Sequence, residues 1–324
     1  MKLSPRSALL TLSLLLASSA SFAAEPKFLD ATSEHFNLYT TENEAAAKAT
    51  LVQFETARAY LVARTGGVDQ FQSPVRLVAY KSNNEYRSHL PASIEAEHCF
   101  SKINGDAVTI VMDGINPRAW EYGLREYVNL VLVRSTPGLP YWLRMGLRDL
   151  YSTMRIADGT IRLGEEPFME QRPALTAPAA SDLSVLFGLH PSDGWGDTPE
   201  AARANGKFLA LGGFDSTMGV GVSPNIRYTA LYLTRLMMLG KDYGPKFGVF
   251  VNALSDGRDT TATFRTVYDQ ALADVGIKLR LAMSQAGIPV ANVKFSLPAA
   301  PAPRLTDLSA ADSATLINEI KARK

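Results

Sequence analysis

Apolar residues recur every three to four positions in two long stretches of the chain, the spacing that places side chains on one face of an α-helix. Leu51, Phe54 and Leu61 follow it within 43–64, and a similar row follows it within 117–134. A proline in the first turn, as at the start of the second stretch, suits a helix because its fixed φ angle fits and its missing N–H has no partner there. Both stretches are therefore predicted as helices.

The rest of the chain divides into a mixed half and a helical half. Runs rich in β-branched or alternating residues, bounded by turn residues, predict strands at 34–40, 75–80, 107–112 and 160–163. Helical spacing predicts further helices at 83–90, 141–154, 225–239, 245–254, 260–272, 275–285 and 309–322. The expected fold class is α+β, with a mixed α+β domain at 24–172, a helical subdomain at 173–290, and a Pro/Ala linker with a terminal helix or tail at 291–324.

The first 23 residues have the order of features of a secretory signal peptide. Lys2 and Arg6 are followed by an apolar run at 8–17 and by the small-x-small pattern Ser21-Phe22-Ala23. The run is too short to cross a bilayer, which needs about 20 apolar residues. We expect cleavage after Ala23 and a mature protein without a membrane span, periplasmic or secreted; a buried N-terminal helix is the alternative.

Composition restricts the classes of partner. The chain is 46% apolar and has one cysteine, so it forms no internal disulfide and must be stabilised by its core. Without Lys2 and Arg6, 31 basic residues face 32 acidic ones, a net charge of −1. With no basic stripe, nucleic acid is not an expected partner.

Sequence signatures of common enzymes are missing. The chain has no Gly-x-Ser-x-Gly elbow, no Walker loop and no strand-linked GxGxxG. None of its histidines, His35, His89, His98 and His190, has another at i+4. Glu97-His98-Cys99 could suggest a metal cluster, but neighbours on a strand point to opposite faces. His190 lies with Trp195 in a Gly/Pro-rich loop that could line a cleft, although a surface loop is the simpler interpretation.

The stretch 124–153 carries the most chemical information. It reads LREYVNLVLVRSTPGLPYWLRMGLRDLYST. It resembles the "peptidase MA-like" family of gluzincin zinc peptidases, whose pattern is roughly His-Glu-Tyr-x-His-Leu, a loop, and Leu-Pro-x-Trp-Leu-Asn-Glu-Gly-Leu-Ala-Glu-x-Tyr-Ser-Thr. The segments at 33–40, 75–86 and around Tyr228 are also similar to family segments, so the resemblance covers most of the mature chain.

The resemblance implies a zincin-like fold and also implies that the metal site is lost. Arg125 and Asn129 stand where the two histidine ligands would be, and Met145 stands where the glutamate ligand would be. Only Glu126, the general base of active relatives, is retained, so we assign it a vestigial catalytic role. Arginine is always protonated and cannot ligate zinc, and a thioether is a poor ligand for it. We expect no cofactor, with zinc bound only in active relatives.

The replaced residues also have ordinary structural interpretations. Periodicity alone makes 125–129 part of an amphipathic helix. Arg125 can place its guanidinium near Glu126 or Asp149, and Met145 can fill volume. A cleft would lie between the two halves, flanked by the helices of Arg125 and Met145, with further candidate residues at Tyr127, Trp142, Asp149 and Tyr228.

Three functions follow as hypotheses. The first is an exported pseudopeptidase that binds a peptide, a cell-envelope component or a protein. The second is a metal-independent hydrolase that uses Glu126 with Asp149 or Tyr127; an adjacent arginine would lower the pKa of the glutamate, which disfavours a general acid. The third is a scaffold protein that acts through its helical half.

Overall fold

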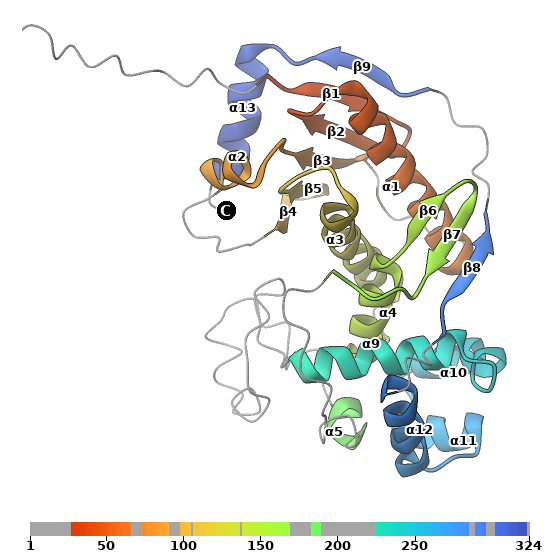
Figure 1. Ribbon diagram of the computed structural model, residues 1–324. Coiled ribbons are helices and arrows are strands. Elements are labelled where there is room, and N and C mark those ends of the chain that lie inside the picture. Colours follow the sequence, from red (N-terminus) through yellow and green to blue (C-terminus); the bar gives the residue numbers. More distant parts are fainter. Residues whose placement is uncertain are drawn as a thin grey trace, which may run out of the picture.

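The fold is α+β and is built around a mixed six-stranded sheet (Figure 1). The computed structural model describes residues 27–65, 71, 73–90, 98–104, 106–136, 138–168, 183–188, 224–284, 289–295 and 302–322. The sheet has the order β4-β5-β3-β2-β1-β9. Its strands are β1 (Leu29–Thr32), β2 (Phe36–Thr40), β3 (Val75–Ala79), β4 (Cys99–Asn104), β5 (Ala107–Met112) and β9 (Arg304–Asp307). β2, β3 and β5 run parallel, and the other neighbours pair antiparallel.

Both faces of this sheet are covered by helices. Helices α1 (Glu44–Thr65) and α3 (Pro117–Ser135) lie on one face, where alternate strand residues such as Leu77 and Ile110 join the main core. The opposite face carries α2 (Asn83–Ser88) and the C-terminal helix α13 (Ala310–Lys321). Since both faces are covered, β3 and β5 are mainly apolar, with Arg76 and Thr109 as their polar residues.

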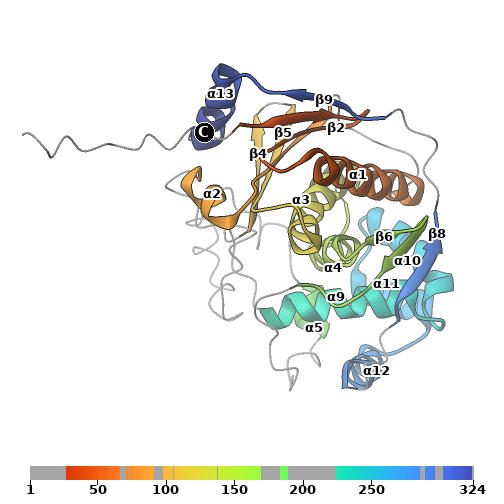
Figure 2. The ribbon, with the colours of Figure 1, turned by 45° about the horizontal axis from the view of Figure 1, so that its top comes forward.

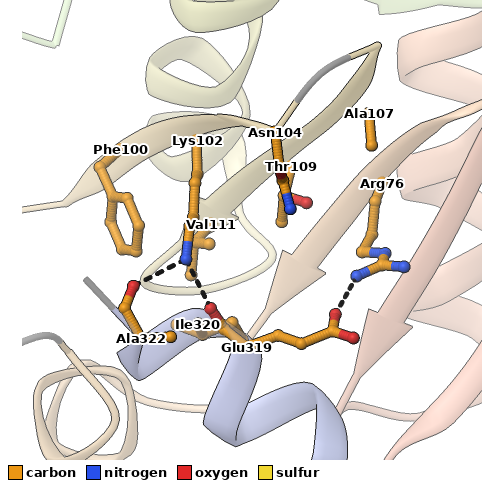
Figure 3. Close-up of a pocket in the computed structure, with 10 residues that line it drawn as sticks. All are labelled: Arg76, Phe100, Lys102, Asn104, Ala107, Thr109, Val111, Glu319, Ile320 and Ala322. Atoms are coloured by element: carbon orange, nitrogen blue, oxygen red, sulfur yellow. Dashed lines mark hydrogen bonds and ion pairs between the residues drawn. The ribbon is translucent and has the colours of Figure 1, made fainter. Parts of the chain in front are cut away.

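Helix α13 is fixed to the sheet by apolar and charged contacts. Leu316, Ile317 and Ile320 pack into a second core cluster on this face. In Figure 3, Lys102 of β4 donates to the carbonyls of Glu319 and Ala322, both at 2.7 Å, and Arg76 of β3 pairs with the Glu319 carboxylate at 2.5 Å. A lysine at the last carbonyls of a helix satisfies groups that have no partner within the helix.

The remaining helices lie on the far side of α3 from the sheet, as Figure 2 shows. Helix α4 (Tyr141–Ser152) packs between α3 and α9 (Pro224–Leu239). Beyond α9 lie α5 (Leu183–Phe187), α10 (Gly244–Ser255), α11 (Thr260–Tyr268) and α12 (Leu272–Ser284). A small antiparallel sheet joins β6 (Arg155–Ala157), β7 (Thr160–Leu163) and β8 (Ala291–Lys294) in the order β6-β7-β8.

The predicted elements that lie in the described ranges are present, but several strands were missed. β1, β4, β6, β8 and β9 were not predicted as strands because each is short or lacks a β-rich run. The helix predicted at 260–272 ends earlier, at Tyr268, because Asp269 adopts a left-handed conformation with φ 53°. The segment expected as a linker with a terminal helix or tail supplies β8, β9 and α13, and β9 pairs with β1.

Some expectations fall outside the described residues. These are the signal peptide at 1–23, the loop with His190 and Trp195, Glu97, and most of the Pro/Ala linker. Within the described ranges, no helix combines the length and the apolar character needed to cross a membrane.

Candidate functional site

Helices α3 and α4 hold Arg125, Asn129 and Met145, the expected degenerate metal positions, and α9 packs on α4. The start of α3 is fixed by Asn116, whose side-chain oxygen accepts hydrogen bonds from the N–H groups of Arg118 and Ala119, both at 3.0 Å. Gly146 lets α4 approach α9 closely, because an added Cβ would lie 2.6 Å from the carbonyl oxygen of Ala230 and against Thr234. The interior of this trio is therefore closely packed.

Asp149 lies where the three helices meet. Its carboxylate accepts hydrogen bonds from Nε of its neighbour Arg148 at 2.8 Å and from Nε of Arg227 on α9 at 2.6 Å. Nε of Arg125 on α3 lies 3.4 Å from the same carboxylate. Asp149, Arg125 and Arg148 are each 1% exposed. The sequence allowed the Arg125 guanidinium to lie near Glu126 or Asp149, and it lies near Asp149.

A second buried carboxylate, Glu121, lies one helical turn before Arg125. It accepts a hydrogen bond from Arg155 at 2.5 Å and from the backbone N–H of Phe168 at 2.9 Å, and it lies 3.6 Å from Nη2 of Arg125. The guanidinium of Arg125 also stacks over the ring of Tyr122, 4.8 Å from its centroid. Arg125 therefore lies between two carboxylates and an aromatic face. We call Glu121, Arg125, Arg148, Asp149, Arg155 and Arg227 the arginine cluster.

Guanidinium groups surround the two carboxylates of the arginine cluster. It holds four guanidinium groups and two carboxylates. Burial alone would raise the pKa of Asp149, but the guanidinium groups of Arg148, Arg227 and Arg125 outweigh it and hold that pKa well below its usual range. Burial and the nearby Arg227 lower the pKa of Arg125. A divalent cation near Asp149 would be repelled by the guanidinium groups of Arg125, Arg148 and Arg227.

Glu126 faces the sheet. Its carboxylate accepts a hydrogen bond from the hydroxyl of Ser101 on β4 at 2.5 Å, and the residue is 9% exposed. β4 is an edge strand of the large sheet. Glu126 thus lies beside a sheet edge, a position at which an extended peptide could add as a further strand.

The other predicted site residues are mostly part of the core. Met145 is 2% exposed and fills volume between helices, as expected, and Asn129 is partly buried. Tyr127 packs edge-on against Phe36, with ring centroids 5.3 Å apart. Trp142 and Tyr228 are also buried and pack on other aromatic rings, those of Phe187 and Tyr232. Of the cleft candidates, the structure brings only Asp149 into direct contact with Arg125.

Sequence reasoning missed four members of the arginine cluster. Glu121 had a local signal, because it precedes Arg125 by four residues on the same helix, the spacing of an ion pair. Arg148, Arg155 and Arg227 had none, since each could equally have been a solvated surface residue. Only the packing of α9 on α4 makes Arg227 a partner of Asp149.

The histidines that the structure describes take structural roles. His98 pairs through Nδ1 with Asp113 at 2.6 Å and lies against Arg118, and His35 pairs with Glu55 at 2.8 Å. Within the described part of the chain, no three His, Cys, Asp or Glu side chains come together as a metal site would require. Comparison of the sequence with models of protein families gives no match, and comparison with curated proteins gives none either.

Proposed function

We propose that this protein is an exported, catalytically inactive relative of the gluzincin peptidases that binds an extended peptide. The observation that carries the proposal is the contact between Arg125 and Asp149, 3.4 Å apart between helices α3 and α4. Arg125 stands at the position of a histidine ligand in the family pattern, and Asp149 stands one turn after the position of the third ligand, Met145.

The physical basis is the usual second shell of a zinc site. A histidine that ligates zinc generally donates its other ring N–H to a carboxylate, which orients the ring. We infer that Asp149 corresponds to such a carboxylate, although its partner in this chain is the guanidinium of Arg125. In this proposal a fixed cation replaces the combination of metal and ligand, so that Asp149 keeps a positive partner without a Lewis acid.

Peptide binding is supported by the edge strand β4. No described strand pairs with the outer edge of β4, whose Ile103 is 56% exposed. Edge strands with unpaired backbone groups can accept an extended peptide through main-chain hydrogen bonds. Glu126 lies beside the same strand through Ser101.

Metal analysis of the purified chain tests the loss of catalysis. We expect no stoichiometric zinc and no cleavage of peptide substrates. The triple variant Arg125→His, Asn129→His, Met145→Glu should bind zinc, with Asp149 as the carboxylate that orients the new side chain at 125. A double variant that keeps Met145 serves as its control and should bind zinc more weakly. Tight zinc together with cleavage by the unaltered chain, lost in Glu126→Gln, would overturn the proposal.

Peptide binding is tested separately with an extended-peptide library. Ile103→Lys should weaken binding of any selected peptide, because it places a charge on the proposed docking edge. Val249→Lys is the matched control, since Val249 is 62% exposed on α10 and lies outside β4. Equal binding by both variants would count against the sheet edge as the binding site.

A further inference from the structure

A cavity of about 600 Å³ lies between the two halves of the fold, away from the arginine cluster. Its walls come from α1, the C-terminal end of α3, α4, α9, α10 and β8. The volume falls within the range of about 300–1,000 Å³ that is typical of small-molecule sites.

The wall of this cavity is mainly apolar. Side chains from both halves of the chain face it, including Leu139, Leu147, Met238, Phe247, Val251 and Val293. Such a wall stabilises an apolar group by removing it from water, at about 25 cal/mol for each Å² buried. The wall therefore suits an aliphatic or aromatic body rather than a strongly polar one.

Among the described residues that line the cavity, Arg64 is the one charged residue, and none of these residues is acidic. Arg64 lies in the last turn of α1, with its guanidinium over the ring of Tyr60, 5.2 Å from the centroid. Among the described residues it forms no ion pair. The Tyr60 and Tyr151 rings, 6.3 Å apart, line the same part of the wall. A cation without a carboxylate, next to an apolar chamber, is complementary to an amphipathic anion.

We propose that this cavity binds a small amphipathic carboxylate, such as a medium-chain fatty acid, with its carboxylate at Arg64 and its apolar chain against the wall formed by α4, α9 and α10. The site is separate from the peptide-binding edge and does not rest on the proposed function. The positive charge of Arg64 disfavours a cationic ligand, and the predominance of apolar side chains among the described lining residues disfavours a free phosphate.

Binding of dodecanoate and dodecanol to the purified chain, measured by titration calorimetry below their aggregation concentrations, tests the head group. Dodecanoate should bind at least about tenfold more tightly than dodecanol, a preference that corresponds to about 1.4 kcal/mol. Arg64→Gln should remove this preference. Arg280→Gln, at another exposed helical arginine outside the lining, should keep it. No binding of dodecanoate, or equal binding of the two ligands, would overturn the proposal.

A second pair of variants tests the apolar wall. Gly248 lines the cavity on α10, and a Cβ added there meets no atom within 4 Å, so the fold tolerates a larger side chain. Gly248→Trp should narrow the cavity and weaken dodecanoate binding at least about tenfold. Val249→Trp places the same side chain one residue away, outside the lining, and should leave binding unchanged. Undiminished binding in both tryptophan variants would show that dodecanoate binds elsewhere.

Discussion

Asp149→Asn should destabilise the protein strongly. The substitution keeps the shape of the side chain but removes the negative charge that faces three arginines. Asp149 accepts from Arg148 Nε at 2.8 Å and Arg227 Nε at 2.6 Å, and it lies 3.4 Å from Arg125 Nε. With Asp149 and two of these arginines about 1% exposed, water cannot replace the lost charge.

The expected cost follows from this burial. Removing one partner of a buried ion pair typically costs about 3–5 kcal/mol, because the remaining charge is left uncompensated. The free energy of unfolding of a domain is about 5–15 kcal/mol, so the variant should lose a large part of it. Asp307→Asn is the control. Asp307 pairs with Lys27 at 2.6 Å with both side chains exposed, and such pairs contribute about 0–1 kcal/mol.

Urea unfolding followed by tryptophan fluorescence measures the loss of unfolding free energy in both variants. A double variant tests whether the loss in Asp149→Asn comes from the uncompensated arginines. Adding Arg227→Gln to Asp149→Asn removes one of the uncompensated cations, so the double variant should lose less than the sum of the two single costs. Coupling energies of about 0.5–3 kcal/mol are typical of residues in direct contact. A cost of Asp149→Asn no larger than that of Asp307→Asn, or strictly additive costs, would refute the account of the arginine cluster.

Three further predictions use other features of the fold. Because the arginines hold the pKa of Asp149 low, the difference in unfolding free energy between the unaltered chain and Asp149→Asn should be constant above about pH 5 and shrink as the pH falls below about 4. Urea unfolding at several pH values measures this difference, and a difference that grows in acid would contradict the prediction. Gly146→Ala should lower the free energy of unfolding, measured by thermal unfolding, by about 1–3 kcal/mol, because its Cβ would press on α9. Gly248→Ala should not lower it, because its Cβ meets no atom within 4 Å. Burial raises the pKa of the Cys99 thiol, so iodoacetamide should label it slowly in the folded protein and quickly in urea. Rapid labelling of the folded chain would show that β4 is more accessible than the 6% exposure of Cys99 indicates.

The fold was predictable wherever one chain segment carries its own signal. Helices α1, α3 and α4 have apolar spacing and breakers at their ends, so their bounds were predicted to within one or two residues. β9 and β1 are short strands that pair across more than 270 positions in the sequence, and the local pattern of neither one indicates that partner. The contacts of the candidate site also differ in how far the sequence indicates them. A contact of Arg125 with Asp149 was one of two that the sequence suggested, the other being with Glu126, but Arg227 joins them only through the packing of α9.

The two proposals concern different parts of helix α3 and can fail separately. Arg125 contacts the arginine cluster, whereas Leu132, seven residues later, lines the cavity. At 1.5 Å per residue these positions are about 10 Å apart along the axis, so a substitution at one need not disturb the other. An Arg125 variant that loses stability but keeps dodecanoate binding would show that the cavity does not depend on the charge cluster. Arg64 is exposed and takes part in no ion pair among the described residues, so Arg64→Gln should leave stability unchanged. Loss of dodecanoate binding in this variant at unchanged stability would show that the arginine cluster does not depend on the cavity.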